Sequence, residues 1–186
     1  MGSMAERPDE RFLVEKARRG DFEPLFRAFE RPVFTLVRRI LGRTEEAEEA
    51  VQETFLEVFK SLPSLRNGGA LWPWIRSVAS SKALMALRRR RLEEEPLPEE
   101  SAPEMEDPVP AFDWKPLDLE KALGALPPLS RAVLWLHDVE GLTHGEIARL
   151  MGTTPSFSKS RLARAHRRLR EVLAAQQKGG SACTSA

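Results

Sequence analysis

An acidic, proline-rich segment most constrains what this chain can fold into. Residues 93–110 hold eight acidic residues and five prolines but no basic residue. The prolines oppose helix formation, the carboxylates repel one another, and few apolar side chains are available for burial. The segment therefore predicts a linker, residues 93–115, between two small domains, residues 8–92 and 116–176, with a disordered tail at 177–186.

Apolar residues recur at helical spacing before this linker, and no segment shows the alternation of a strand. The first predicted helix spans about residues 22–40, with Asp21 as its N-cap, Gly42 as its stop and Pro32 as a possible kink. A second helix is predicted to start after Thr44. It should bury Ala47, Val51, Phe55, Val58 and Leu62.

The third predicted helix runs over residues 71–92 and ends in four consecutive arginines. Its expected buried residues are Trp74, Ile75 and Val78. Together these periodicities predict an all-α fold of two small helical domains, the first a bundle of three or four helices.

The second domain contains the pattern of a helix-turn-helix. Thr143 and Glu146 have capping-box spacing, Gly152 suits the end of that helix, and Thr154-Pro155 suits the start of the next. The second helix should bury Leu162, Ala165, Leu169 and Val172. Its opposite face is polar and basic, as a helix in the DNA major groove requires. A solvated amphipathic helix in a bundle is the alternative interpretation.

Charge segregation favours a polyanionic partner. The chain carries 29 basic and 28 acidic residues, and eight of the acidic ones lie in residues 93–110, so the remainder is net positive. The only cysteine, Cys183, excludes an internal disulfide and fits a reducing cytoplasm. No apolar run approaches the ~20 residues of a membrane span, so membrane insertion is not expected.

The residue patterns of catalysis and metal binding are not found. His137, His144 and His166 fall on different segments without metal-ligand spacing, and no phosphate-binding glycine loop or nucleophile motif occurs. The sequence therefore predicts no enzyme activity, no catalytic residues, no metal and no cofactor.

Two separate motif blocks resemble one protein family. The blocks are "QETFLEVF" with "WPWIRSVASSKALMALRRR", and "LGALPPLSRAVLWLHDVEGLTHGEIARLMG" with "SKSRLARAHRRL". In this order they resemble the extracytoplasmic-function (ECF) sigma factors of the sigma-70 family, over about residues 12–173. The resemblance implies a subunit that brings core RNA polymerase to a promoter and assists promoter opening. Its DNA partner would be the double-stranded promoter and then the melted promoter. It also implies a sigma region 2-like first domain and a region 4-like second domain.

The resemblance also implies which residues do this. The face that docks on the largest subunit of the polymerase would comprise Glu49, Gln52, Glu53 and Leu56. Contacts to the minus-ten promoter element would come from Ser81, Arg88, Arg89, Arg90 and Arg91. Contacts to the minus-thirty-five element would come from Ser156, Lys159, Ser160, Arg161, Ala163, Arg164, Arg167 and Arg168. Of these, Arg164 is the candidate for bidentate recognition of guanine.

Three positions depart from the family pattern. Ser81 stands where asparagine is usual and Met85 where aspartate is usual, which affects the minus-ten preference. Ser158 replaces an inward-facing valine; its hydroxyl is expected to bond back to Thr154, with Phe157 filling the missing volume.

The resemblance leaves other functions open. Family members are usually inhibited by an anti-sigma factor, which makes such a regulator an expected partner. The Ser81 and Met85 departures keep open a sigma-like decoy that sequesters this regulator. A simple helix-turn-helix regulator is the third possibility, although it would need neither the docking face nor the acidic linker.

Overall fold

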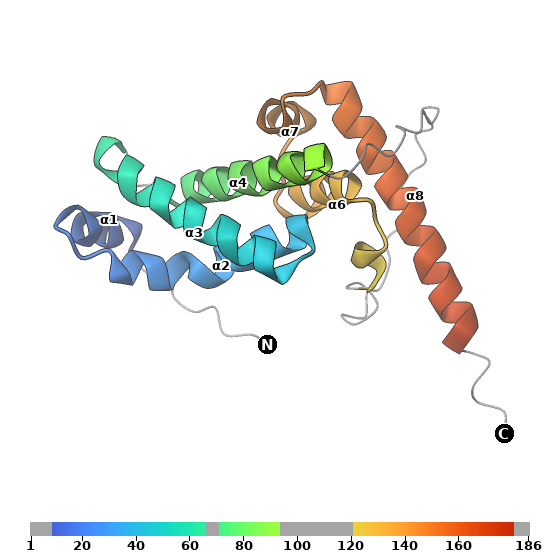
Figure 1. Ribbon diagram of the computed structural model, residues 1–186, viewed down its shortest axis with the longest axis horizontal. Coiled ribbons are helices and arrows are strands. Elements are labelled where there is room, and N and C mark those ends of the chain that lie inside the picture. Colours follow the sequence, from blue (N-terminus) through green and yellow to red (C-terminus); the bar gives the residue numbers. More distant parts are fainter. Residues whose placement is uncertain (1–8, 66–70, 94–120, 181–186) are drawn as a thin grey trace. The chain divides into compact units, whose positions relative to one another are not determined.

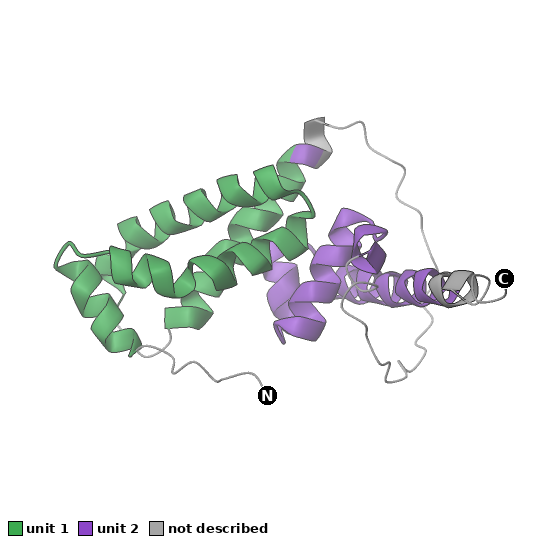
Figure 2. Ribbon diagram, turned by 90° about the horizontal axis from the view of Figure 1, so that it is seen from below, with its two compact units in different colours: residues 1–89 green, residues 90–186 purple. Residues whose placement is uncertain are grey.

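The computed structural model describes residues 9–65, 71–93 and 121–180 of the chain. By its internal contacts the chain divides into two compact units, residues 1–89 and 90–186 (Figure 2). Each unit is a separate set of packed helices with its own buried residues, and the described residues contain no strand. The predicted all-α fold is confirmed.

The N-terminal unit consists of helices α1 to α4 and one short 3-10 turn (Figure 1). They are α1 (Glu10–Arg18), α2 (Glu23–Leu41), α3 (Thr44–Ser61), the 3-10 turn η1 (Leu62–Ser64) and α4 (Leu71–Glu93). Helix α2 packs against both α1 and α3. Its fully buried residues include Leu25, Val33, Leu36, Val37 and Ile40, and the residues predicted to be buried in α3 are all buried. The unit therefore has one apolar core centred on α2.

Helix α2 differs from the prediction at its start and in its middle. Phe22 is the N-cap and makes no side-chain cap, whereas the Asp21 carboxylate lies 3.4 Å from Nζ of Lys16 in the turn after α1. The helix also continues through Pro32, whose side chain is exposed, so this proline does not end it. The predicted stop is confirmed, because Gly42 adopts a left-handed conformation with φ of +80°.

Helix α1 was not identified from the sequence. Asp9 caps it by accepting a hydrogen bond from the backbone N–H of Arg11 at 3.0 Å. Glu10, at its first position, accepts a hydrogen bond at 2.8 Å from the backbone N–H of Leu71, the first residue of α4. A free N–H at a helix start needs such an acceptor, so α1 fixes the start of α4.

Helix α4 is less deeply buried at its start than predicted. Ile75 is fully buried, but Trp74 and Val78 are only half-buried. Trp72 instead stacks on Phe29 of α2, with ring centroids 5.9 Å apart and nearly parallel planes. The aromatic contact made by Trp72 requires a neighbouring helix, which sequence periodicity does not identify.

The C-terminal unit forms around one long helix. Its elements are α6 (Pro128–Leu134), the π-helical turn η2 (Trp135–Val139), α7 (His144–Met151) and α8 (Pro155–Gly180). Both α6 and α7 pack against α8. Because α8 continues to Gly180, it includes the first residues of the predicted disordered tail. The predicted linker lies almost entirely outside the described residues.

Candidate functional site

The turn between α7 and α8 has the local chemistry of a helix-turn-helix. Thr143 accepts a hydrogen bond from the backbone N–H of Glu146 at 3.3 Å, and the Glu146 carboxylate accepts one from the backbone N–H of Thr143 at 2.8 Å. Gly152 ends α7 in a left-handed conformation with φ of +64°. Thr154 then caps α8 by accepting a bond from the N–H of Phe157 at 3.2 Å. The capping box, the glycine stop and the second cap are all confirmed.

The buried side of α8 is close to the predicted one. Leu162, Ala165 and Leu169 are buried as expected. The fourth buried position is Leu173 rather than Val172, which is half-buried. Position 173 follows 169 by four residues, so it stays over the same face of a helix with 3.6 residues per turn.

The opposite side of α8 presents the residues predicted to contact the minus-thirty-five element. Ser156, Lys159, Ala163, Arg167 and Arg168 are exposed, and Ser160, Arg161 and Arg164 are half-buried. Two of the cations have partners on the helix itself: Arg161 lies over the Phe157 ring at 4.9 Å, and Arg168 lies 3.1 Å from a Glu171 carboxylate oxygen. Nε of Arg164 is buried and makes no hydrogen bond within the described residues.

The expected environment of Ser158 was wrong. This side chain is fully buried, but its hydroxyl lies 3.0 Å from Nδ1 of His144 on α7, not against Thr154. The backbone N–H of Ser158 makes the bond to the Thr154 carbonyl instead. Phe157 is half-buried beneath the Arg161 guanidinium. The polar side chain thus joins α7 to α8, because a buried hydroxyl needs a partner.

The four residues predicted to dock on polymerase lie on α3, and two of them, Glu49 and Glu53, line a cleft. Gln52 and Leu56 are exposed, and Leu56 retains 59% of its accessible surface. Phe59, one turn further on, retains 55% and adds to the same apolar surface. Sequence reasoning did not identify Phe59, whose ring contacts Phe22 edge-on at 5.4 Å.

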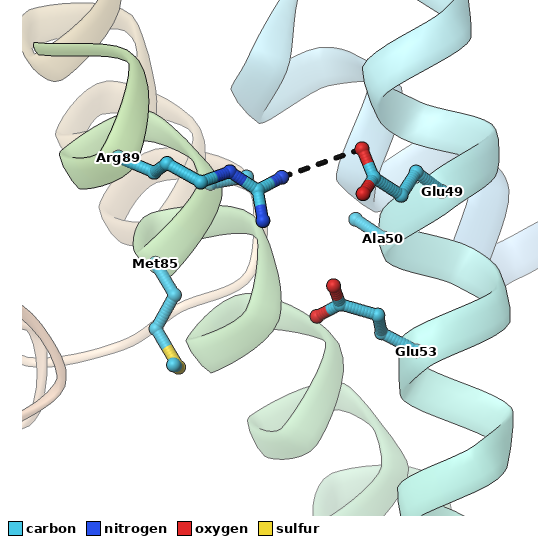
Figure 3. Close-up of a pocket in the computed structure, with 6 residues that line it drawn as sticks. Glu49, Ala50, Glu53, Met85 and Arg89 are labelled. Atoms are coloured by element: carbon cyan, nitrogen blue, oxygen red, sulfur yellow. Dashed lines mark hydrogen bonds and ion pairs between the residues drawn. The ribbon is translucent and has the colours of Figure 1, made fainter. Parts of the chain in front are cut away.

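A cleft of about 180 Å³ separates α3 from α4 (Figure 3). It is lined by Glu49, Ala50 and Glu53 from α3 and by Met85, Ala86 and Arg89 from α4. The Arg89 guanidinium reaches across it to the Glu49 carboxylate, at 3.3 Å between nitrogen and oxygen. The sequence assigned these two residues to different partners, whereas the structure brings them together.

The remaining residues predicted to contact the minus-ten element lie along α4. Ser81 is half-buried in the middle of the helix, Arg88 is exposed and Arg90 is half-buried. Met85, at the second departure from the family pattern, retains 60% of its surface and lines the cleft. The side chain of Arg91 lies outside the described residues.

Two of the three histidines contact one carboxylate, and the third stacks on one of these two. His137 and His166 contact separate oxygens of Asp138, at 2.9 and 2.6 Å. The His137 ring also stacks on His144, with centroids 4.5 Å apart. Sequence reasoning missed this cluster because the residues come from three elements. Among the described residues, no group of three or more histidine, cysteine or acidic side chains has a metal-binding arrangement.

The cluster changes the acidity of two of its members. Burial alone would raise the pKa of Asp138, but the hydrogen bonds from His166 and His137 outweigh burial and lower that pKa. The pKa of His144 is also lowered, first by burial and then by the nearby positive charges of His137 and Lys159. The folded state therefore favours an ionised Asp138 and a neutral His144.

Two family models match this chain, one on each side of the acidic segment. Sigma-70 region 2 matches residues 25–93, and Sigma-70 region 4 matches residues 117–169. The first match covers α2 to α4, and the second includes the helix-turn-helix.

Individual relatives align along most of the chain. The RNA polymerase sigma factor CarQ of Myxococcus xanthus is 32% identical, over 82% of this chain and 88% of its own length. The ECF sigma factor SigE of Mycolicibacterium smegmatis is 33% identical, over 86% of this chain but only 64% of its own length. The ECF sigma factor SigM of Mycobacterium tuberculosis is 29% identical, over 92% of this chain and 88% of its own.

Solved structures share the fold. The sigma factor RpoE of Bartonella quintana, in complex with the anti-sigma factor NepR, has a TM-score of 0.55 at 23% identity and covers 82% of this chain and 96% of its own. CnrH, in complex with the cytosolic domain of CnrY, has a TM-score of 0.53 at 20% identity and covers 90% of this chain and 98% of its own.

Proposed function

Because the chain belongs to the extracytoplasmic-function sigma factors of the sigma-70 family, we propose that it binds core RNA polymerase, directs it to specific promoters and assists promoter opening. The observation that carries this proposal is the order of the two matched regions, one on each side of the acidic segment. The chain is a transcription initiation factor.

The exposed side of α3 is the proposed polymerase-docking surface. It combines the carboxylates of Glu49 and Glu53 with the amide of Gln52 and the exposed apolar side chain of Leu56. A central apolar residue surrounded by polar groups is typical of a specific protein interface. Exposed carboxylates attract a basic partner, while Leu56 gains stabilisation from burial.

The arginines at the end of α4 are the proposed contacts to minus-ten DNA. Arg88 is exposed, and Arg89 is exposed and paired with Glu49. An exposed ion pair is worth no more than about 1 kcal/mol, so a DNA phosphate can displace the Glu49 carboxylate at small cost. These guanidiniums would supply affinity for the DNA phosphate backbone. Ser81 lies nearer the start of the same helix.

The exposed side of α8 is the proposed reader of the minus-thirty-five element. The N-terminal part of a recognition helix contacts base edges, and Lys159, Ser160, Ala163 and Arg164 lie in its first turns. Arg161 at the flank and Arg167 and Arg168 further along are placed to hold phosphates.

A protein that covers the docking surface is the proposed regulator. Two structures of similar fold are complexes with NepR, an anti-sigma factor, and with the cytosolic domain of CnrY. By extension we assign this chain an anti-sigma partner and a cytoplasmic location. Within the described residues, no helix has the length and apolar character of a membrane span.

In vitro transcription with purified core polymerase and fragmented genomic DNA tests the proposal. Transcripts with defined start sites should appear only when the chain is added. A chain that binds polymerase yet yields no such transcripts would instead support the decoy function, for which the unusual Ser81 and Met85 are the motivating observation. A chain that binds DNA but not polymerase would support a simple helix-turn-helix regulator.

A further inference from the structure

The three histidines of the chain come from three consecutive elements of the C-terminal unit. His137 comes from η2, His144 from α7 and His166 from α8. Together with Asp138 of η2 they form what is called here the histidine–aspartate cluster. Histidines at a protein surface do not have to contact one another or a common carboxylate. The contacts within this cluster therefore call for a physical explanation.

Asp138 is the centre of the cluster and links η2 to α8. Its Oδ1 lies 2.9 Å from Nδ1 of His137, and its Oδ2 lies 2.6 Å from Nε2 of His166. Only 18% of the His166 side chain is exposed. Hydrogen bonds to an ionised carboxylate are stronger than those between neutral groups, and partial burial strengthens them further.

A second link joins α7 to α8. The His144 ring stacks on His137 and its Nδ1 lies 3.0 Å from the hydroxyl of Ser158, which is fully buried. Ser158 and His166 are about two helical turns apart on α8. The cluster therefore attaches α8 to the preceding elements at two points.

The two attachment points enclose the proposed base-reading segment. Lys159, Ser160, Ala163 and Arg164 all lie between Ser158 and His166 in the sequence. A rotation or sliding of α8 would move their side chains relative to base edges, and bidentate readout tolerates little displacement. Two fixed points define both the rotation and the axial position of a rigid helix.

We propose that the histidine–aspartate cluster, with Ser158, positions the recognition helix for base readout. His137, Asp138, His144 and His166 are positioning residues and do not themselves touch bases. This inference rests on the proposed function, because it concerns how accurately α8 reads promoter DNA.

The charged groups around His144 favour its neutral form. Lys159 of α8 contributes to the lowered pKa of His144, and His137 is stacked directly on that ring. Arg131, the charged residue of α6, is buried and contributes to the pKa shift of neither Asp138 nor His144. An imidazole in either protonation state carries at least one N–H donor, so the contact between Nε2 of His166 and Asp138 does not depend on titration of His166.

The test compares three variants of the full chain assembled with core polymerase. His166→Leu removes the donor to Asp138, whereas His166→Gln retains an N–H donor at a similar reach without titrating. Glu171→Gln is the matched control, since it removes the exposed partner of Arg168 on the same helix without touching the cluster. Binding selection on duplexes with a randomised upstream element gives the base profile, and fluorescence anisotropy gives the affinity for the selected and a scrambled element.

We expect His166→Leu to lower the ratio of specific to scrambled affinity roughly tenfold, the equivalent of one charge-assisted hydrogen bond. The affinity for scrambled DNA should change less than about twofold, because phosphate contacts do not need accurate seating. His166→Gln should restore the ratio, and Glu171→Gln should leave the base profile unaltered.

The outcomes separate this inference from the function on which it rests. A wild-type holoenzyme that selects no upstream sequence would reject base reading by α8, and the inference with it. A wild-type profile that persists in His166→Leu with an unchanged affinity ratio would overturn the inference alone. If circular dichroism shows that His166→Leu is unfolded, Ser158→Ala breaks the second attachment, and an unchanged ratio in that variant would overturn the inference equally.

Discussion

At the scale of single residues, the cations of α8 differ in how firmly they are held. Arg161 lies over an aromatic ring and Arg168 pairs with Glu171, whereas Arg164 has a buried Nε that makes no hydrogen bond within the described part of the chain. Because Arg164 is half-buried, its guanidinium loses less freedom on binding a base than a fully exposed one would. Arg164 is therefore the best placed of these residues for direct readout.

Arg164→Ala should reduce affinity for the selected minus-thirty-five element by about 1–3 kcal/mol and relax the preference at one base pair. The matched comparison is Arg167→Ala, which should weaken binding to all sequences and reduce the salt slope by about one unit. Binding selection and salt titration of the holoenzyme measure both effects. A uniform loss in Arg164→Ala, with the base profile unchanged, would assign this residue to a phosphate.

The lowered pKa of His144 gives the C-terminal unit a pH-dependent stability. The folded state takes up this proton less readily than the unfolded chain, so the free energy of unfolding should fall as the pH drops through about 6.5. Asp138, also lowered, loses its contribution only below its ordinary pKa near 3.8. The two shifts therefore act in different pH ranges.

Urea unfolding of the full chain, followed by the amide NMR signals of α7 between pH 8 and pH 5.5, measures the effect of His144. In His144→Asn, which keeps a polar atom near Ser158 but does not titrate, the decline should be smaller. An equal decline in wild type and variant would show that other groups cause it.

At the scale of elements, α3 and α4 act as one surface. The cleft between them is lined by Glu49 and Glu53 of the proposed docking surface and by Arg89, a proposed DNA contact, and the Glu49–Arg89 pair crosses it (Figure 3). The proposed docking and DNA contacts would thus involve neighbouring side chains. Because both side chains of the Glu49–Arg89 pair are partly exposed to solvent, the coupling energy between the proposed docking and DNA contacts is limited to about 1 kcal/mol.

Charge reversal of the docking carboxylates tests the role of α3. Glu49→Lys with Glu53→Lys should weaken core-polymerase binding by no more than about 4 kcal/mol, because the surface is partly screened by solvent. Glu45→Lys with Glu48→Lys reverses the same number of charges on exposed positions of the same helix and is the control. Equal affinities for the docking variant and the wild type, in a titration of labelled polymerase, would mean that the docking face is elsewhere.

A double-mutant cycle tests the contact between α3 and α4. Glu49→Gln should strengthen the affinity of the holoenzyme for minus-ten DNA by up to about 1 kcal/mol at low salt, because it releases Arg89. In an Arg89→Gln background the same change should have no effect. A gain that persists without Arg89 would reflect the lost negative charge rather than the ion pair.

At the scale of the whole molecule, the acidic segment lies between the two matched regions. The region 2 match is on one side and the region 4 match on the other, so each unit can contact its own part of a promoter. Leu56 and Phe59 remain exposed on the N-terminal unit. Exposed apolar side chains that are close together are characteristic of a surface covered by a partner.

Affinity purification of the tagged chain from its own cells should recover polymerase subunits together with a second regulatory protein. Leu56→Asp should lower the yield of both, since an anti-sigma factor is proposed to cover the polymerase-docking surface. Gln176→Asp, near the end of α8 in the C-terminal unit, is the control. Recovery of polymerase without any second protein would count against the proposed regulator.

The sequence by itself determined the features that depend on near neighbours along the chain. The Thr143–Glu146 capping box, the Gly42 and Gly152 stops and the buried stripe of α8 were all readable, because each involves residues within one or two turns. The family was readable for a related reason, since its motifs are local and their order is preserved.

Only the tertiary structure decided which distant side chains meet. Asp21 suited an N-cap by its position, but the turn after α1 placed it on Lys16. Ser158 took His144 as its partner, Arg89 took Glu49, and Asp138 took His166, while the ring of His144 stacked on His137. Such pairs depend on how helices cross, and crossing is set by the summed packing of many side chains rather than by any local pattern.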